Sequence, residues 1–153
     1  MINIQGDEPF IQPQQIDLLC SCFLSSAIEI ATLVKKIKEE KELINPNTPK
    51  VILNKNKQAI YFSRTPIPFY RNKENYADWL KLHSYYKHIG IYGFRVSTLL
   101  QITHLPPSAL EIAESLEQLR WIENGYRISA AITEFESIAI DTPGDLQNLK
   151  LTK

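Results

Sequence analysis

The stretch KVILNKNKQAIYF at residues 50–62 decides the fold class. Two runs rich in β-branched, aliphatic and aromatic residues, 50–53 and 58–62, flank the polar residues 54–57. Runs of this kind around a short polar segment are typical of two antiparallel strands joined by a turn. The stretch therefore predicts a β-hairpin, and with it a sheet that contains antiparallel strands.

Helices and further strands are predicted on both sides of this hairpin. Pro13 suits a first helical turn, and an apolar stripe follows it as far as about residue 25. Ser108 and Glu111 form a capping box for a helix that extends to 124, with Gly125 at its C-terminal cap. The other expected elements are strands at 1–4, 27–34, 85–95, 127–133 and 137–140, a charged helix or loop at 35–43, a long excursion at 70–84, and a last helix from 142.

The mixture of hairpin-linked strands with helices predicts an α/β fold, in which a mixed sheet has flanking helices. The chain has 153 residues, 44% of them hydrophobic, so a single domain spanning 1–153 is expected. Gly90 and Gly93 lie inside a predicted strand, where glycine usually marks a bulge or a close backbone approach. Residues 1–4 read as a strand end, and because a core strand needs neighbours on both sides, the sequence predicts an N-terminally truncated domain.

The charge balance and the cysteine content argue against several function classes. Lys and Arg total 17 against 17 Asp and Glu, and this zero net charge argues against a nucleic-acid partner or an anionic membrane partner. No apolar run reaches transmembrane length and no basic-then-apolar leader opens the chain, so a soluble, cytoplasmic protein is expected. Cys20 and Cys22 point to different faces of a predicted helix, which favours buried, reduced thiols over a metal pair or a disulfide.

Two aspartates follow short apolar strands and are candidate metal ligands. Asp7 follows the strand at 1–4, and Asp141 follows the strand at 137–140. Carboxylates at strand ends are well placed to hold Mg²⁺, a hard cation that prefers oxygen ligands. The alternative is structural: Asp7 braces a turn, and Asp141 caps the helix that Pro143 begins.

The long predicted helix carries a concentration of acidic residues. Glu111, Glu114 and Gln118 fall on one side of it, and Glu117 lies at the edge of its apolar stripe. Carboxylates this close repel one another, so sugar hydroxyls or arginines are expected as partners. The alternative is a solvated face with an ion pair between Glu117 and Arg120.

A second polar group lies on the strand predicted at 85–95. Alternation places His88, Gly90 and Tyr92 on one face, where two polar residues flanking a glycine can line a ligand surface. Arg64, at the end of a hairpin strand, suits a clamp on a carboxylate or a phosphate. The alternatives are a structural histidine and a surface ion pair. No Walker loop, dinucleotide fingerprint, zinc spacing or nucleophile elbow occurs in the sequence, so nothing supports a Ser or Cys nucleophile.

Five motifs in order resemble those of CMP-Kdo synthetases, the 3-deoxy-manno-octulosonate (Kdo) cytidylyltransferases, along the whole chain. The motifs are NIQGDEP at 3–9, AIYFSR at 59–64 with IP at 67–68, HIGIY at 88–92, LEQLR at 116–120, and DTP at 141–143 with DL at 145–146. The nearest competitor, the CMP-sialic acid synthetases, shares the general plan but not this series. The resemblance implies a nucleotide-diphospho-sugar transferase-like, Rossmann-like fold.

The resemblance also implies an activity, that of a nucleotidyltransferase. The anomeric hydroxyl of Kdo attacks the α-phosphorus of CTP, giving CMP-Kdo for lipopolysaccharide synthesis and pyrophosphate. By the same resemblance Asp7 and Asp141 are the Mg²⁺ ligands and the catalytic residues. It further implies that a homodimer forms, that Arg64 lies near the Kdo carboxylate, and that the Kdo site is lined by Gln5, His88, Tyr92, Glu117 and Gln118.

The sequence departs from the family pattern in two ways. Ala109, Ala139 and Gly144 replace a usual proline, glycine and acidic residue. The family's basic loop that grips the CTP phosphates has no counterpart here, so the chain alone is expected to be inactive unless a separate N-terminal piece supplies that loop. The alternatives are a non-catalytic dimerisation or sugar-binding fragment, and a cytidylyltransferase for a related acid sugar.

Overall fold

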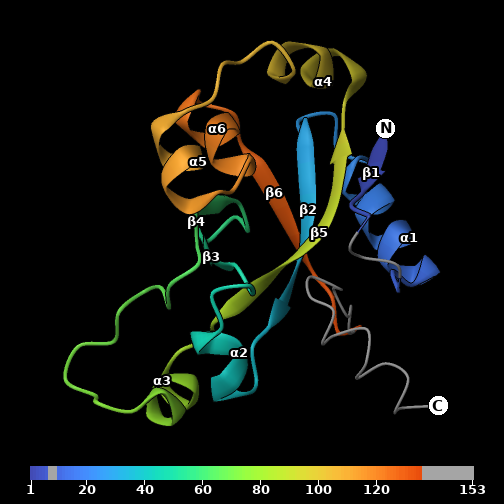
Figure 1. Ribbon diagram of the computed structural model, residues 1–153. Coiled ribbons are helices and arrows are strands. Elements are labelled where there is room, and N and C mark those ends of the chain that lie inside the picture. The colour runs from blue at the N-terminus through green and yellow to red at the C-terminus, as the bar shows by residue number, and fades with distance from the viewer. Residues whose placement is uncertain (7–9, 136–153) are drawn as a thin grey trace.

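The computed structural model describes residues 1–6 and 10–135, and its sheet is organised around the long strand β5 (Figure 1). The strands are β1 (Ile2–Ile4), β2 (Ile30–Lys36), β3 (Lys50–Leu53), β4 (Ala59–Ser63), β5 (Tyr86–Phe94) and β6 (Ile128–Ile132). The helices are α1 (Pro13–Cys22), α2 (Glu40–Ile44), α3 (Tyr76–Leu82), α4 (Val96–Ile102), α5 (Ala109–Glu114) and α6 (Gln118–Glu123).

The sheet is mixed, as the sequence predicts. Its strand order is β4-β3-β5-β2-β6, and β1 also pairs with β5. Strands β2 and β6 run parallel, while the other pairs are antiparallel. The first half of β5 pairs with β3 and its second half with β1, so β5 connects the β3–β4 hairpin to the start of the chain. The predicted hairpin and the α/β class are confirmed.

Both interior glycines of β5 serve the purposes that the sequence predicts. Thr32 of β2 lies opposite Tyr92 whereas Leu33 lies opposite Ile89, so the register shifts where β5 contains Gly90. A β-carbon on Gly93 would lie 2.4 Å from the ring of Phe23. Gly90 therefore lies at a bulge and Gly93 at a close approach between β5 and the end of α1.

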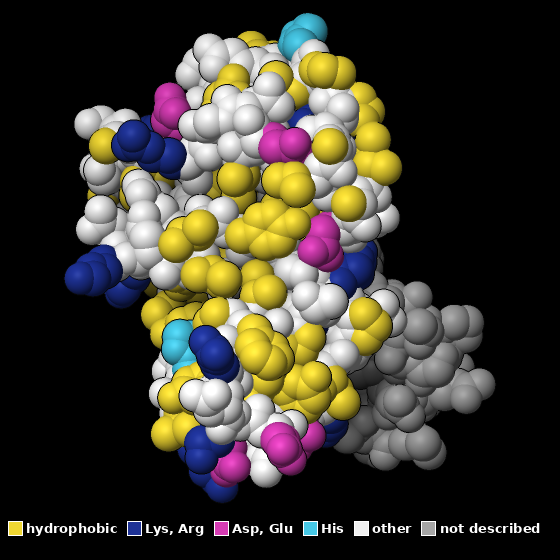
Figure 2. All heavy atoms as spheres, turned by 90° about the vertical axis from the view of Figure 1, so that its left-hand side faces the viewer, with side chains coloured by type: hydrophobic (Ala, Val, Ile, Leu, Met, Phe, Trp, Pro, Cys, Tyr) yellow, Lys and Arg dark blue, Asp and Glu magenta, His cyan; other side chains and the backbone are white. Residues whose placement is uncertain are grey.

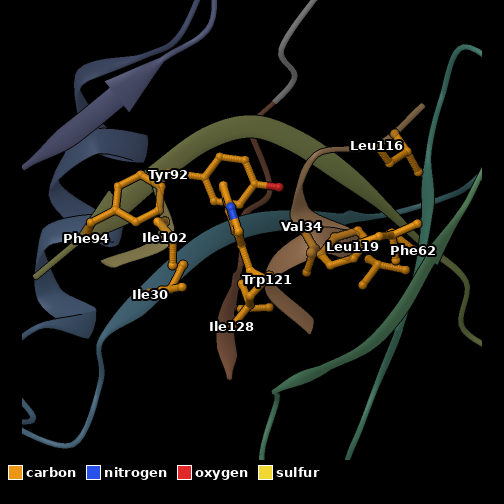
Figure 3. Packing of buried hydrophobic residues seen from close by; sticks show 12 residues of the cluster. Ile30, Val34, Phe62, Tyr92, Phe94, Ile102, Leu116, Leu119, Trp121 and Ile128 are labelled. Atoms are coloured by element: carbon orange, nitrogen blue, oxygen red, sulfur yellow. The ribbon is translucent and has the colours of Figure 1, made fainter. Parts of the chain in front are cut away.

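Apolar clusters cover the two faces of the sheet. On one face Tyr92, Phe94 and Phe62 pack with Leu119 and Trp121, from the α5–α6 side of the molecule (Figure 3). On the other face Leu33, Ile89 and Ile91 pack against Leu19 of α1. A third cluster joins Leu43 of α2 to Trp79 of α3 and to Tyr85. The sheet therefore lies between α1 on one side and the α4–α6 segment on the other (Figure 1).

The single long helix predicted at 108–124 is wrong, because the structure has two short helices there. Ser115 follows α5 in a left-handed conformation with φ of 52°, and α6 begins three residues later. Arg64 stabilises the break from outside, since its guanidinium donates hydrogen bonds to the carbonyls of Glu114 and Ser115. The predicted cap at Gly125 is confirmed by its φ of +84°.

Other sequence expectations are changed in detail. The excursion predicted at 70–84 contains α3, which starts where the Asn75 side chain accepts a hydrogen bond from the backbone of Asp78. Helix α4 had no predicted counterpart. Both cysteines are free, as predicted, but Cys20 is exposed rather than buried. The strand predicted at 137–140 and the last helix lie outside the described residues.

No helix in the described part of the chain is both long enough and apolar enough to span a membrane.

Candidate sugar-binding site

Two predicted site residues, His88 and Tyr92, meet on one face of β5. Their ring centroids lie 5.1 Å apart. The ring centroid of Phe62 lies 5.3 Å from that of His88, and the ring centroid of Trp121 lies 5.0 Å from that of Tyr92; both pairs are T-shaped. Strand alternation across the bulge thus places the two polar side chains together against the aromatic part of the core.

The hydroxyl of Tyr92 is a buried polar group without a partner. Tyr92 is 2% exposed, and its hydroxyl has no hydrogen-bond partner among residues 1–6 and 10–135. Burial raises the pKa of this hydroxyl well above its ordinary value, and the Glu117 carboxylate raises it further. A buried hydroxyl without a partner costs about 1–3 kcal/mol, which makes this hydroxyl a candidate for a hydrogen bond to a ligand.

The break between α5 and α6 places Glu117 and Gln118 on the side of the core to which the Tyr92 hydroxyl points. In Figure 3 the Tyr92 hydroxyl points to the side of the cluster on which Leu116, the residue before Glu117, lies. Glu117 is exposed and is the N-cap residue of α6, while Gln118, the first residue of α6, is 5% exposed. Neither side chain has a hydrogen bond or ion pair to another described residue. Unpaired acceptors and donors therefore lie on the α6 side of Tyr92.

His88 is held from the opposite strand. Its Nε2 atom lies 2.9 Å from the hydroxyl of Thr32 in β2, and its Nδ1 atom has no hydrogen-bond partner in the described part of the chain. Burial lowers the pKa of His88 to about 3, so the imidazole is neutral at physiological pH. The side chain is only partly buried by surface area, so a ligand can reach it.

Gln5 lies at the edge of this site through the pairing of β1 with β5. Its backbone N–H donates to the carbonyl of Gly90 at 3.2 Å, and Ile4 lies opposite Ile91. Gly90 lies between His88 and Tyr92 in the sequence, so Gln5 is adjacent to both along the strand. Its side chain is exposed.

Arg64, the residue after β4, contacts the α5–α6 break. Its guanidinium donates to the carbonyls of Glu114 at 2.7 Å, Pro46 at 3.0 Å and Ser115 at 3.1 Å. These three hydrogen bonds use three of the five N–H groups that an arginine carries. The arginine therefore holds the break in place, and its two other N–H groups have no partner in the part of the chain that the structure describes.

The acidic residues of α5 have protein partners. Glu114 accepts hydrogen bonds from the Ser63 hydroxyl at 2.7 Å and from the backbone N–H of Arg64 at 2.9 Å. Glu111 accepts two hydrogen bonds from Arg120, which lowers the pKa of the Glu111 carboxyl. An arginine was one of the expected partners of these acidic residues, and Arg120 is that partner for Glu111. The alternative ion pair, between Arg120 and Glu117, is not the one that the structure shows.

The two predicted metal ligands, Asp7 and Asp141, lie outside the described residues, so their role stays a prediction. Among the residues that are described, no group of three or more His, Cys, Asp or Glu side chains is arranged to hold a metal ion. Hollows elsewhere, one beside Tyr126 and Arg127 and one beside Phe69 and Trp79, contain none of the predicted site residues.

One residue of the site, Thr32, was missed by sequence reasoning. It is completely buried, and its hydroxyl contacts both His88 and the carbonyl of Ile91. The available signal was a lone hydroxyl residue in the middle of the apolar strand 30–34. A polar side chain that is buried in such a strand needs a partner across the sheet.

The chain is similar to curated proteins along almost its whole length. The 3-deoxy-manno-octulosonate cytidylyltransferase of Parabacteroides distasonis is 56% identical over 151 residues, covering 96% of this chain and 60% of the relative. That of Cytophaga hutchinsonii is 58% identical over 146 residues, covering 95% and 58%. The chain thus spans about 60% of the length of these curated relatives.

Solved structures show the same fold. The structure of a CMP:2-keto-3-deoxy-manno-octonic acid synthetase complexed with CTP matches with a TM-score of 0.85 and 37% identity, covering 99% of this chain and 60% of that one. The inositol-1-phosphate CTP transferase from T. maritima, at 17% identity and a TM-score of 0.56, shares the fold. The family model described as "Cytidylyltransferase" matches residues 1–132. The chain belongs to the cytidylyltransferase family.

Proposed function

We propose that this chain carries the sugar-binding side of a 3-deoxy-manno-octulosonate cytidylyltransferase, a nucleotidyltransferase that transfers CMP from CTP to Kdo and releases pyrophosphate. The observation that carries the proposal is the buried Tyr92 hydroxyl, which has no partner among the described residues and feels the charge of Glu117, together with the side chains of Glu117 and Gln118, for which the described residues likewise offer no partner. The names and the CTP complex of the relatives support the substrates.

The chemistry of Kdo fits these groups. Kdo is an eight-carbon sugar acid with one carboxylate and several hydroxyls, each of which can donate and accept hydrogen bonds. The Tyr92 hydroxyl and the Gln118 amide can do both, while the Glu117 carboxylate accepts only. Gln5 and His88 complete the site at the bulge of β5. The two remaining N–H donors of Arg64 are the proposed partners of the Kdo carboxylate.

Transfer of the cytidylyl group also requires neutralisation of phosphate charge. We propose Asp7 and Asp141 as ligands of Mg²⁺, because carboxylate oxygens suit this hard cation and Asp7 follows the end of β1 at Ile4 by three residues in the sequence. When bound, Mg²⁺ supplies charge neutralisation at the phosphates of CTP. The residues of this chain bind and orient the sugar hydroxyl that attacks.

A homodimer is part of the proposal. Figure 2 shows hydrophobic side chains gathered in a band over the face that carries β4, α5 and the segment between β4 and α3. Exposed residues on these segments include Ile60, Phe69 and Ile112. An exposed apolar area of this kind favours a protein contact. Because CTP is a cytoplasmic nucleotide, the proposed reaction takes place in the cytoplasm.

The binding half of the proposal is tested by calorimetric titration of the purified chain with Kdo. Mannose, which lacks the carboxylate, and N-acetylneuraminate, a longer sugar acid, are the control ligands. We expect Kdo to bind and mannose not to bind. A folded chain that binds no Kdo would overturn the proposal, and tighter binding of N-acetylneuraminate would reassign the sugar.

The transfer half is tested by pyrophosphate release from CTP, Mg²⁺ and Kdo. We expect little release from the chain alone, and release when an N-terminal piece of a relative that carries the nucleotide loop is added. Asp7→Ala in the same mixture should abolish the release. Release that survives Asp7→Ala would contradict the assigned metal ligand.

A further inference from the structure

Thr32 occupies an unusual position in the middle of β2. Its side chain is completely buried, and its hydroxyl oxygen lies 2.8 Å from the carbonyl of Ile91, 3.4 Å from that of Ile89 and 2.9 Å from Nε2 of His88. The register of β2 against β5 shifts between Thr32 and Leu33. The hydroxyl is therefore placed at the bulge, where the regular ladder of backbone hydrogen bonds is interrupted.

The hydrogen-bond roles at this hydroxyl follow from counting protons. A threonine hydroxyl has one proton to donate and lone pairs with which to accept. The carbonyl of Ile91 can only accept, and it is the closest partner, so it receives the hydroxyl proton. Nε2 of His88 must then supply the proton of its own contact with Thr32. A neutral imidazole that is protonated at Nε2 has a lone pair at Nδ1.

The ring of His88 is neutral, so only one of its two nitrogens carries a proton and the other can accept a hydrogen bond. Burial lowers the pKa of His88 to about 3. The Phe62 and Tyr92 rings border the imidazole, and Nδ1 has no hydrogen-bond partner among the described residues. Nδ1 is thus a pure acceptor on a ring whose centroid lies 5.1 Å from that of Tyr92, and the Tyr92 hydroxyl has no partner among the described residues.

We propose that Thr32 is a positioning residue of the sugar site, which fixes His88 as the Nε2-protonated tautomer so that Nδ1 accepts a hydrogen bond from a sugar hydroxyl. This inference rests on the proposed function for the identity of the ligand. A sugar hydroxyl can donate or accept, but one that donates to Nδ1 is left to accept from neighbouring donors such as the Tyr92 hydroxyl or the Gln118 amide. Thr32 therefore sets the direction of the hydrogen-bond chain without touching the sugar.

Two variants of Thr32 separate this role from a structural one. Thr32→Val keeps the shape and removes the hydroxyl, whereas Thr32→Ser keeps the hydroxyl and removes only a methyl group. The tautomer is read without any sugar, by long-range ¹H–¹⁵N NMR of the histidine rings in the whole chain. His88→Gln identifies the signals of His88 among those of the three histidines.

We expect the wild-type chain and Thr32→Ser to show His88 protonated at Nε2 and bare at Nδ1 at pH 7. Thr32→Val should show a mixture of the two tautomers, and its affinity for Kdo should fall about tenfold, the loss of one well-aligned hydrogen bond. Thr32→Ser should bind Kdo within about twofold of wild type.

The proposal is overturned by a wild-type His88 that is protonated at Nδ1, a result that needs no variant to fold. It is also overturned if folded Thr32→Val keeps both the wild-type tautomer and the wild-type affinity. A wild-type chain that shows the expected tautomer but binds no Kdo would overturn the proposed function, and with it the sugar-facing role. The tautomer signal tells these failures apart.

Discussion

The guanidinium of Arg120 donates two hydrogen bonds to the carboxylate of Glu111 across the break between α5 and α6, with Nε to Oε2 at 2.7 Å. Both side chains are largely buried, at 18% and 15% exposure. Glu111 also accepts a hydrogen bond from the backbone N–H of Ser108, so one carboxylate caps α5 and anchors α6. This ion pair fixes the orientation of α6 relative to α5, and with it the positions of Glu117 and Gln118 at the start of α6.

The pH dependence of stability should reveal this pair. Arg120 holds the pKa of Glu111 below its ordinary value of 4.5. A carboxyl whose folded pKa is depressed stabilises the fold above its unfolded pKa, and this contribution is lost as the pH falls through the folded pKa. The difference in free energy of unfolding between wild type and Glu111→Gln should therefore be constant above about pH 5.5 and shrink below pH 4.5.

Urea denaturation at a series of pH values measures that difference. Glu40→Gln, on the exposed first turn of α2, is the control and should show no comparable dependence. A Glu111→Gln difference that grows as the pH falls would contradict the assignment of the pair.

Glu114→Gln tests how the hairpin is joined to the α5–α6 break. One carboxylate oxygen accepts a hydrogen bond from the Ser63 hydroxyl and the other accepts one from the backbone N–H of Arg64. The glutamine amide has only one oxygen, so it can keep only one of these two hydrogen bonds, and without charge assistance. We expect the free energy of unfolding to fall by about 1–2 kcal/mol. Glu40→Gln should change it by less than about 0.5 kcal/mol. Equal effects of the two substitutions would show that the contact contributes nothing specific.

Gly93→Ala tests the close approach of β5 to α1. The added β-carbon would lie 2.4 Å from the Phe23 ring, so the ring or the strand must move, at a cost of about 1–3 kcal/mol. Phe23→Leu in the same chain should recover part of that loss, because it removes the aromatic edge. Gly6→Ala, with no atom within 4 Å of the added carbon, is the matched control for thermal denaturation. A Gly93→Ala chain as stable as wild type would contradict the close contact between Gly93 and the Phe23 ring.

Sequence reasoning succeeded where local patterns determine the structure. The β3–β4 hairpin is encoded by two apolar runs around a polar turn, and the placement of His88 with Tyr92 follows from strand alternation. Gly93 marks its close approach because a β-carbon there would lie 2.4 Å from the Phe23 ring. Each of these inferences needs only residues that are near one another in the chain.

It failed where distant residues decide the local conformation. Nothing in the periodicity of 108–124 indicates the left-handed Ser115, because the groups that hold the break come from Arg64, about fifty residues earlier in the chain. The partner of Thr32 lies across the sheet in β5, so its role depends on the register of two strands. Tertiary hydrogen bonds of this kind override local propensity.

Removal of the buried Tyr92 hydroxyl should have different effects on sugar binding and on stability. Tyr92→Phe removes a hydroxyl that has no partner within residues 1–6 and 10–135, so the free energy of unfolding should stay the same or rise by up to about 1 kcal/mol. Tyr85→Phe is the matched control, because Tyr85 is also buried but its hydroxyl donates to the carbonyl of Pro68. That variant should lose about 1 kcal/mol of stability and keep its affinity for Kdo.

The most direct test of the proposed sugar site is the dissociation constant for Kdo, measured by calorimetry on wild type, Tyr92→Phe and Tyr85→Phe. The site predicts that affinity falls about tenfold in Tyr92→Phe, although this variant is at least as stable as wild type, and that Tyr85→Phe binds like wild type. Unchanged Kdo affinity in a well-folded Tyr92→Phe chain would contradict the claim that the unpaired hydroxyl is kept for the sugar.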